Sequence, residues 1–592
     1  MAVQKPVFMA WYGAEAAGAG PAGWLGVLLH GLWLDATVAG YVTALPLLIT
    51  LLSFWVRFPE RMWRRLLTAY FVAVSVFTAV IFSVDLALYE HWGFRLDATI
   101  LIYLADPGEA MASVDFWLGV RQTFLAALYA AAMIWLYRRV LRLFDGEPCA
   151  WHLALPGSLL FLLLAGADFL AIRGGLGASV ANVSKVYFSP KMFLNHAATN
   201  PVFSFLSSLG DNEDFAAAYP FFDESERAAR FEALRGNGPA SGPTERVLDS
   251  LRTRPNVVVV ILESFARTVM DETVDGREVM PCMQRLKREG IWFENLFANS
   301  FRTDRGEVAI LSGFPAQTRV SIMKYPGKSR SLPSLARSLS RAGYATSFCY
   351  GGDLNFTDQA QYMYATGWQE LIWQKDLHFD ADWGWDDALM CDWFADRVIA
   401  LDAGGKPFLA GLLTLSSHKP FDVPYAKFED PVLNAMAFSD ECVGRMIDRL
   451  KASPAWDNLL VVLVADHGYP YPKTLPYNVP LRHRIPMIWT GGAVSSPRIV
   501  GTYASQIDIA ATLLSQLGLP HDDYDYSKDI FAPAPPRKFG YYTFNDGFGV
   551  VDSLGEAIWD ATSGRTVSAT NPDLLDVGRT MLQTTYTDIA NR

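Results

Sequence analysis

The 592-residue chain is longer than one ordinary domain, and 51% of its residues are hydrophobic while 19% are charged. Its formal net charge of −11 argues against a nucleic-acid partner, because a phosphate backbone requires a basic surface. The five cysteines are scattered without a CxxC pair, which argues against a zinc ribbon or a disulfide framework.

The first third of the chain is apolar, and charged residues dominate only after about residue 210. Four stretches contain about the 20 apolar residues that a bilayer core requires. They predict membrane-spanning helices at residues 36–56, 66–88, 117–137 and 152–171. Residues 16–34 are uncharged but rich in Gly and Ala, and we interpret them as a tilted or interfacial helix, with a weak fifth span as the alternative.

Arginines gather in two of the loops between these spans. They are Arg57, Arg61, Arg64 and Arg65 after the first span, and Arg138, Arg139 and Arg142 after the third. The loop around Glu90 to Asp115 is net acidic. The positive-inside rule therefore places the arginine loops in the cytoplasm. We expect a multi-pass membrane protein, with everything after the fourth span outside the cytoplasm.

The composition of the chain changes at the end of the fourth span and again near residue 250. Residues 1–171 are the expected transmembrane anchor. Residues 172–250 combine glycines and asparagines with a polar, helix-prone stretch, and they are interpreted as a linker with an amphipathic segment. Residues 251–592 are the expected globular domain, because strand and helix patterns alternate there.

Four continuous apolar runs of strand length predict the strands of this domain. They are Val257–Leu262, Phe408–Leu415, Leu459–Val464 and Ile485–Trp489. Helical patterns such as Leu332–Ala342 and Val432–Lys451 lie between them. Strands that are apolar on both faces and alternate with helices favour an α/β domain with a mainly parallel central sheet.

Polar side chains follow three of these runs. Glu263 comes directly after the first run, His418 after the second, and Asp466 and His467 after the third. The carboxyl ends of parallel strands share one edge of a sheet, where ligands bind. Carboxylate and imidazole groups suit Zn²⁺ or Mn²⁺, with Mg²⁺ as a further alternative, so one divalent cation is predicted here.

A nucleophile is predicted on the segment that opens the helical pattern ending at Leu311. Thr303 lies at the start of this pattern, where backbone N–H groups and the helix dipole favour a phosphate or an alkoxide. A plain capping threonine is the alternative. Arg305 and Arg484 are candidates for binding phosphate oxygens, with ordinary ion pairs as the alternative for both.

Taken together, these motifs resemble one family. In chain order they are Glu263 after its strand, Ser300-Phe301-Arg302-Thr303-Asp304-Arg305-Gly306, Tyr350-Gly351-Gly352-Asp353, Ser417-His418-Lys419-Pro420-Phe421 and Ala465-Asp466-His467-Gly468. The pattern covers roughly residues 255–530 and comes with a multi-span anchor. It resembles the lipoteichoic acid synthase family of phosphoglycerol transferases, in the sulfatase-like part of the alkaline phosphatase superfamily, and especially its Gram-negative members. The resemblance implies that residues 251–592 are a sulfatase-like catalytic domain in the periplasm, anchored in the bacterial cytoplasmic (inner) membrane.

The resemblance implies a reaction and a role for each matching position. The metal-site positions match Glu263, Thr303, Asp466 and His467. Thr303 would also be the nucleophile, His418 would contact the substrate head group or protonate a leaving oxygen, and Asp353 is taken as substrate-binding. The family moves a head group, most often phosphoglycerol, from a membrane phospholipid through a phosphothreonine to a glycan or glycolipid acceptor. Diacylglycerol is released.

Two departures from related patterns matter for the substrate. The lipoteichoic acid synthases carry a Trp and an Arg shortly after the glycine-containing strand end, whereas Asn355–Gln361 contains neither. No Cys/Ser-x-Pro-x-Arg motif occurs near Thr303, which argues against sulfate ester hydrolysis. The alternatives are a phosphoethanolamine transferase, a phosphodiesterase or phosphatase, and a non-catalytic membrane sensor. The full set of site residues argues against the sensor.

Overall fold

The computed structural model describes residues 1–56, 59–98, 100–101, 116–142, 151–177, 179–211, 214–236, 244–249, 254–377, 386–533 and 537–592. Arg57 and most of the acidic loop that ends at Asp115 lie outside these residues. The chain divides into two compact units, Met1–Asn212 and Glu213–Arg592.

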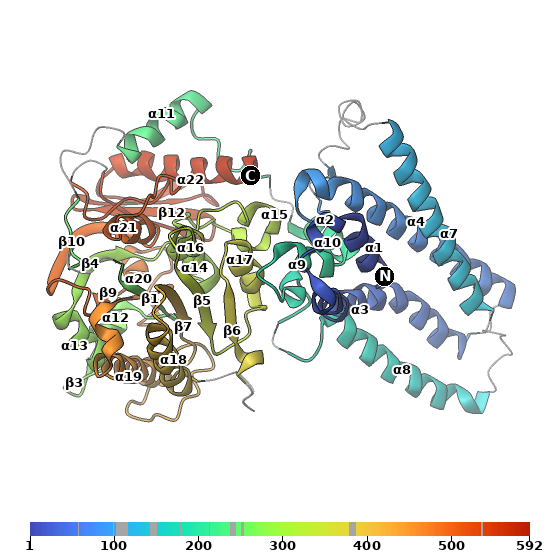
Figure 1. Cartoon of the computed structure of the whole chain (residues 1–592), viewed down its shortest axis with the longest axis horizontal. Coiled ribbons are helices and arrows are strands. Elements are labelled where there is room, and N and C mark those ends of the chain that lie inside the picture. The colour runs from blue at the N-terminus through green and yellow to red at the C-terminus, as the bar shows by residue number, and fades with distance from the viewer. Residues whose placement is uncertain are drawn as a thin grey trace. The chain divides into compact units, whose positions relative to one another are not determined.

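The first unit contains four long apolar helices (Figure 1). They are α3 (Gly20–Ser53), α4 (Glu60–Trp92), α7 (Phe116–Leu141) and α8 (Trp151–Arg173). Each is long and apolar enough to cross a membrane. Many of their large apolar side chains are exposed, such as Leu163 at 74%, as expected for a surface that meets lipid. The four predicted spans are confirmed as helices.

Residues 16–34 differ from the expected separate helix. From Gly20 onward they continue without a break into α3. The charge of Asp35 does not end the helix because its side chain is buried and paired. Nζ of Lys5, on α1 (Gln4–Trp11), lies 2.6 Å from Oδ2 of Asp35, and Nδ2 of Asn200 donates to Oδ1 at 2.8 Å.

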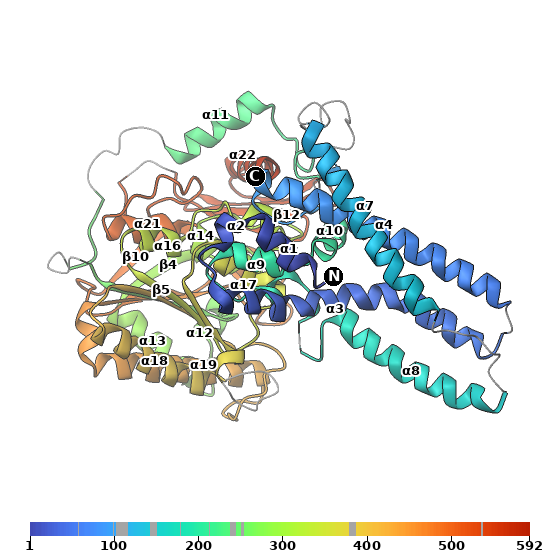
Figure 2. The ribbon, with the colours of Figure 1, turned by 45° about the vertical axis from the view of Figure 1, so that its right-hand side comes forward.

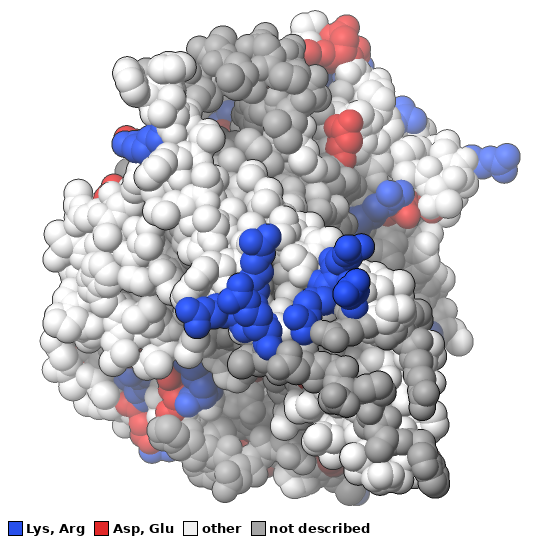
Figure 3. All heavy atoms as spheres, turned by 90° about the vertical axis from the view of Figure 1, so that its right-hand side faces the viewer, with Lys and Arg blue, Asp and Glu red and all other residues white. Residues whose placement is uncertain are grey.

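Helices α4 and α7 pair in antiparallel fashion. Phe71 stacks on Tyr137 with ring centroids 4.3 Å apart, and Phe82 packs on Tyr129 at 4.8 Å. The start of α4 therefore lies beside the end of α7. The exposed arginines at this end are Arg61, Arg64, Arg65, Arg138, Arg139 and Arg142. Figure 3 shows basic side chains gathered on a face that otherwise carries little charge.

The second unit is built on an eight-stranded sheet. Its order is β10 (Arg498–Ser505), β4 (Ile291–Phe297), β9 (Met487–Thr490), β8 (Leu459–Ala465), β1 (Asn256–Leu262), β7 (Phe408–Leu413), β5 (Ala345–Tyr350) and β6 (Glu370–Trp373). Of the eight strands, β9 runs antiparallel to both neighbours and the others are parallel to one another. The four predicted strands are β1, β7, β8 and β9, and the mainly parallel sheet is confirmed.

Helices cover both faces of this sheet (Figures 1 and 2). One face carries α13 (Pro281–Glu289), α18 (Asp387–Ala403) and α19 (Pro431–Lys451), and the other carries α14 (Thr303–Ser312), α16 (Leu335–Arg341) and α21 (Asp508–Gln516). Every residue of β1 and β8 is buried between these layers. A second, antiparallel sheet of β11 (Gly540–Phe544), β12 (Gly547–Asp552), β13 (Gly555–Asp560) and β14 (Arg565–Ala569) packs against α22 (Asp573–Asn591).

The predicted linker is shared between the two units. Helices α9 (Met192–Ala198) and α10 (Pro201–Ser208) belong to the first unit, and α11 (Glu224–Arg235) belongs to the second. The proposed boundaries near residues 172 and 250 stay a prediction.

Candidate active site

Two neighbouring strands deliver the acidic groups of the site. Leu262 at the end of β1 pairs with Ala465 at the end of β8. Glu263 and Asp466 therefore leave the sheet side by side, and His467 follows at once. The side chains of Glu263 and Asp466 are buried, and that of His467 is 13% exposed. One edge of the sheet thus brings two carboxylates and an imidazole together.

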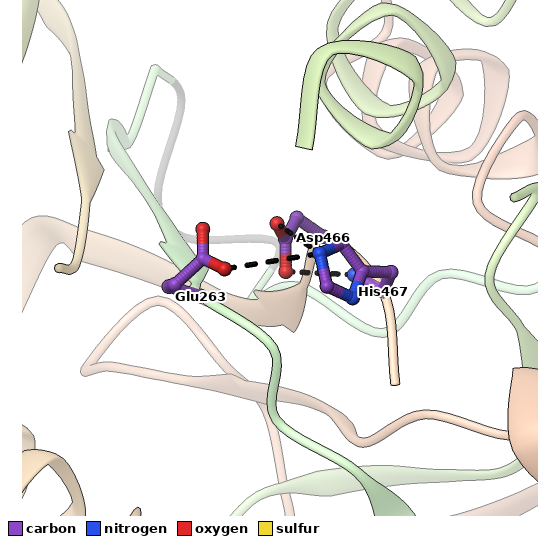
Figure 4. A group of neighbouring side chains, drawn as sticks. All are labelled: Glu263, Asp466 and His467. Carbon is purple, nitrogen blue, oxygen red and sulfur yellow. Dashed lines mark hydrogen bonds and ion pairs between the residues drawn. The ribbon is translucent and has the colours of Figure 1, made fainter. Parts of the chain in front are cut away.

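The three side chains converge on a common point (Figure 4). One ligand atom from each of Glu263, Asp466 and His467 lies within 4.8 Å of the other two. Nε2 of His467 is 3.7 Å from Oε1 of Glu263 and 3.4 Å from Oδ2 of Asp466. The site residues expected at these two strand ends are therefore brought together.

Hydrogen bonds from backbone and side-chain groups hold this part of the site in place. Oδ1 of Asp466 accepts hydrogen bonds from the N–H groups of Ser264 and His467, both at 2.7 Å. The hydroxyl of Ser264 donates to Oε1 of Glu263 at 2.7 Å. Nε2 of Gln506 donates to the carbonyl of Asp466 at 2.7 Å. The orientation of both carboxylates is fixed before any ligand binds.

Thr303 reaches this group from a helix rather than from a strand end. It is the first residue of α14, and its hydroxyl donates to Oε2 of Glu263 at 3.1 Å. The residue before it, Arg302, is the N-cap and makes no side-chain cap. Helix α14 approaches the site closely because of Gly306, where an added Cβ would lie 2.2 Å from the carbonyl oxygen of Asp466.

The electrostatics of the cluster reflect burial of like charges. Burial, followed by the negative charge of Asp466, raises the pKa of Glu263 to about 7. Burial also raises the pKa of Asp466 to about 6, although two backbone N–H groups favour its ionised form. The pKa of His467 is lowered by burial, which favours the neutral imidazole that binds metals. Burying two ionised carboxylates side by side is energetically unfavourable unless a cation balances their charge.

The donor set suits a divalent cation. Oδ2 of Asp466 is buried and has no hydrogen-bond partner among the described residues, so it is free to bind a ligand. Two carboxylate oxygens and an imidazole nitrogen are typical donors for Zn²⁺ and Mn²⁺. Thr303 offers a fourth oxygen beside Glu263. The residues present therefore fit a metal site.

His418 and Asp353, the expected substrate-binding residues, lie around this centre. His418 is exposed, and its charge acts on the pKa of Glu263, which places it nearby. Asp353 is half-buried and accepts from the N–H and Nδ2 of Asn355 at 2.9 and 2.8 Å. The buried phenol of Tyr350 has its pKa raised by burial and then by Glu263, and Asp353 adds to this. The roles of His418 and Asp353 in substrate binding stay predictions.

Arg305 and Arg484, the expected phosphate ligands, have other partners. Arg305 is 3% exposed, and its guanidinium donates to the hydroxyl of Ser300 at 3.2 Å and to the carbonyl of Arg319. Arg484 binds Oε1 of Glu294 at 2.9 Å and Oδ1 of Asn295 at 3.0 Å. Their roles in the reaction stay predictions.

Two charged residues near the site are not predicted from the sequence, and the first is Glu307. Glu307 is fully buried, and both its oxygens lack a hydrogen-bond partner in the part of the chain that the structure describes. Burial, and then the charge of Asp466, raises its pKa well above the usual range. Glu307 follows Thr303 by one helical turn, so the i,i+4 spacing was a usable signal.

Arg482 is the second missed residue. Its backbone carbonyl touches Gly468, where an added Cβ would lie 2.4 Å away, and its charge acts on His467. Nε of Arg482 is buried without a hydrogen-bond partner among the residues described. The sequence could not separate Arg482 from its basic neighbours His483 and Arg484, which point elsewhere.

Parts of the chain are similar to known proteins. Residues 255–519 match the family model described as Sulfatase. The chain is 27% identical over 319 residues to Phosphoglycerol transferase I of Xanthomonas campestris pv. campestris, covering 48% of this chain and 44% of that protein. It is 24% identical over 303 residues to Lipoteichoic acid synthase 2 of Bacillus subtilis, covering 45% and 46%. The chain spans about half the length of the curated relatives it matches.

Solved structures share the fold of the second unit. A protein of the alkaline phosphatase superfamily from Vibrio parahaemolyticus aligns with a TM-score of 0.55 at 22% identity, covering 63% of this chain and 97% of that one. A lipoteichoic acid synthase from Listeria monocytogenes aligns with a TM-score of 0.52 at 21% identity, covering 62% and 98%. The predicted fold is confirmed, and the predicted resemblance is borne out by the Sulfatase match and by the two relatives.

Proposed function

We propose that the protein is a membrane-anchored, metal-dependent transferase of phospholipid head groups, on the premise that residues 255–519 match the family model described as Sulfatase. The observation that carries the proposal is the Thr303 hydroxyl, which is hydrogen-bonded to Glu263 inside a cluster fit to hold a cation. Thr303 also begins a helix, where backbone N–H groups favour an anionic phosphate.

Phosphoglycerol is the head group we propose, with phosphatidylglycerol as the donor and a glycan or glycolipid as the acceptor. Two relatives are named for phosphoglycerol transfer and lipoteichoic acid synthesis, which supports this choice. The four apolar helices fit a protein that works on a membrane lipid. By the positive-inside rule, the exposed arginines at one end of α4 and α7 favour a cytoplasmic position for that end, and we propose a periplasmic catalytic unit.

The metal we propose is Mn²⁺ or Zn²⁺, held by Glu263, Asp466 and His467 with Thr303 as the fourth residue. When bound, it lowers the pKa of a coordinated hydroxyl and balances the charge of phosphate oxygens. Arg482 is proposed to bind a phosphate oxygen, since its guanidinium lies near His467 and its Nε has no hydrogen-bond partner among the described residues.

In the first step, Oγ of Thr303 attacks the phosphorus of the lipid phosphodiester. The bond between phosphorus and the diacylglycerol oxygen breaks, and the proton of Thr303 passes to Oε2 of Glu263, 3.1 Å away. His418, which is exposed at the site, gives a proton to the leaving diacylglycerol oxygen. The products are diacylglycerol and a phosphothreonine that carries the head group.

In the second step, a hydroxyl of the acceptor attacks the phosphothreonine. Its proton goes to His418, which restores the protonated histidine of the first step. The bond between phosphorus and Oγ of Thr303 breaks, and Glu263 returns the proton to Thr303. Water in place of the acceptor would make the protein a phosphodiesterase.

Incubation of the full chain in nanodiscs with Mn²⁺ tests the proposal. Phosphatidylglycerol and phosphatidylethanolamine, each labelled in the head group, are compared. We expect diacylglycerol from phosphatidylglycerol, with label on wild-type protein and none on Thr303→Ala. Release from phosphatidylethanolamine alone would indicate a phosphoethanolamine transferase. Free glycerol phosphate without protein label would indicate direct hydrolysis, and no diacylglycerol from either lipid would refute head-group transfer.

A further inference from the structure

The first unit contains a pocket that the proposed reaction does not use. Its volume is about 510 Å³, which lies in the range of small-ligand sites. The side chains and the glycine that define it are Trp11, Tyr12, Gly13, Glu15, Glu90 and Arg121. They come from α1, from α2 (Gly13–Ala16), and from the facing ends of α4 and α7.

The back wall of the pocket is rigid. Tyr12 is buried, and its hydroxyl donates to the carbonyl of Leu86 on α4. Its ring lies 5.0 Å from the ring of Tyr89 and 5.1 Å from that of Phe8. These contacts fix α1 against α4, so the pocket is formed before a ligand enters.

The pocket carries both signs of charge. Arg121 lies over the ring of Trp11, with its central carbon 4.5 Å from the ring centroid. This contact orients the guanidinium and leaves its N–H groups in the guanidinium plane available to an anion. Glu15 and Glu90 are exposed and line the same pocket. A ligand with a phosphate and an ammonium group would match both halves.

The level of the pocket is that of lipid head groups. Arg121 precedes Arg138 by 17 residues on α7, which is about 26 Å along a helix. Arg138 belongs to the arginine-rich end, and a bilayer core is about 30 Å thick. Arg121 thus lies near the opposite boundary, where an amphipathic ring such as that of Trp11 is favoured.

We infer that this pocket binds the head group of a zwitterionic phospholipid that carries a primary ammonium group. The phosphate lies on Arg121, and the ammonium lies between Glu15 and Glu90. A primary ammonium donates hydrogen bonds to both carboxylates, whereas the trimethylammonium of choline has no N–H to donate. The face of Trp11 is taken by Arg121, which removes the aromatic surface that choline would use.

Native mass spectrometry of the full chain tests the inference without any assay of catalysis. The detergent-purified protein receives equal amounts of phosphatidylethanolamine, phosphatidylglycerol and phosphatidylcholine. We expect phosphatidylethanolamine to be retained most. Arg121→Gln should reduce its retention at least about fivefold, and Arg138→Gln, at the other end of α7, should leave it unchanged. The double variant Glu15→Gln/Glu90→Gln should shift the preference toward phosphatidylglycerol.

A steric variant separates the pocket from general surface charge. An added Cβ at Gly13 meets no atom within 4 Å, so Gly13→Leu adds an apolar side chain at the pocket wall without a clash at Cβ. We expect it to lower phosphatidylethanolamine retention as Arg121→Gln does. Equal retention of all three lipids by the wild type, or equal losses in Arg121→Gln and Arg138→Gln, would refute the inference. Neither result bears on head-group transfer.

Discussion

The hydroxyl of Thr303 donates a hydrogen bond to Oε2 of Glu263 although the two residues are 40 positions apart. Glu263 directly follows a central strand, and Thr303 begins a helix on one face of the sheet. The contact therefore depends on the fold rather than on local sequence. It places a hydroxyl beside a carboxylate that is itself fixed by the hydroxyl of Ser264. A nucleophile with an adjacent proton acceptor is the arrangement that covalent phosphoryl transfer needs.

Removal of this hydroxyl tests the nucleophile. Thr303→Ala should lower diacylglycerol release by a factor on the order of 10⁴ or more, as expected when a nucleophile is lost. The free energy of unfolding of this variant should fall by only about 0.5–1.5 kcal/mol, because one hydrogen bond is lost and the N-cap position is Arg302. Thr303→Ser should keep part of the activity. Turnover by Thr303→Ala near the wild-type rate would mean that water attacks phosphorus.

The close approach of α14 to Asp466 is a second testable feature. Gly306→Ala would place a Cβ 2.2 Å from the carbonyl oxygen of Asp466, and both backbones would have to move. We expect a loss of about 1–3 kcal/mol in stability and a displaced Thr303, with activity falling more than tenfold. Gly501→Ala is the matched control, because its Cβ meets no atom within 4 Å. Equal thermal stability of the two variants would contradict the crowding argument.

Two neighbouring arginines should behave differently when truncated. Arg482→Ala should lower kcat/KM by about 10- to 100-fold with little change in melting temperature, because it removes a phosphate donor that has no fold partner at Nε among the described residues. Arg484→Ala should lower the melting temperature instead, since it leaves Glu294 without its 2.9 Å partner. Steady-state kinetics and thermal unfolding of both variants check this. The reverse pattern would assign the phosphate to Arg484.

The stability of the protein should depend on pH through Asp440. This carboxylate of α19 caps α13 by accepting from the N–H groups of Cys282 and Met283 at 2.8 and 2.7 Å. Burial raises its pKa to about 7, against about 3.9 in an unfolded chain. Between these values the folded state holds a proton that the unfolded state has released. This contribution is therefore complete below about pH 4 and is lost as pH rises through about 7.

Asp440→Asn removes this titration. The melting temperature of the wild type minus that of the variant should fall between pH 5 and pH 7 and stay constant above pH 8. Thermal unfolding of both full chains in one detergent, measured across this range, checks the prediction. A difference that grows with pH would mean that the two N–H donors outweigh burial and lower the pKa of Asp440.

Much of the fold could be predicted because it depends on long local patterns. Buried strands such as Val257–Leu262 are apolar on both faces. The four long apolar helices of the first unit are longer than any described helix of the second unit. The extent of α3 could not be predicted, because Asp35 looks like a break until Lys5 is seen to neutralise it. The antiparallel direction of β9 could not be predicted either, because an apolar run does not indicate how a strand is oriented relative to its neighbours.

The site was partly readable for a similar reason. Glu263, Asp466 and His467 stand at strand ends, and the topology alone brings strand ends together. Side-chain direction was not readable. The run Arg482-His483-Arg484 gives three basic residues, yet His483 stacks on Tyr542 at 4.0 Å and Arg484 binds Glu294. Tertiary partners therefore decide which cation remains for a substrate.

The pairing of Lys5 with Asp35 has a consequence for the membranes that suit this anchor. Helix α3 has 34 residues, or about 51 Å, against a hydrocarbon thickness of about 30 Å. Asp35 precedes the end of the helix at Ser53 by 18 residues, or about 27 Å. If α3 crosses a bilayer with Ser53 at one boundary, the ion pair lies near the other boundary, where the acyl chains give way to water. A thicker bilayer would submerge two charges together with apolar helix, and the mismatch would favour thinner membranes over thicker ones.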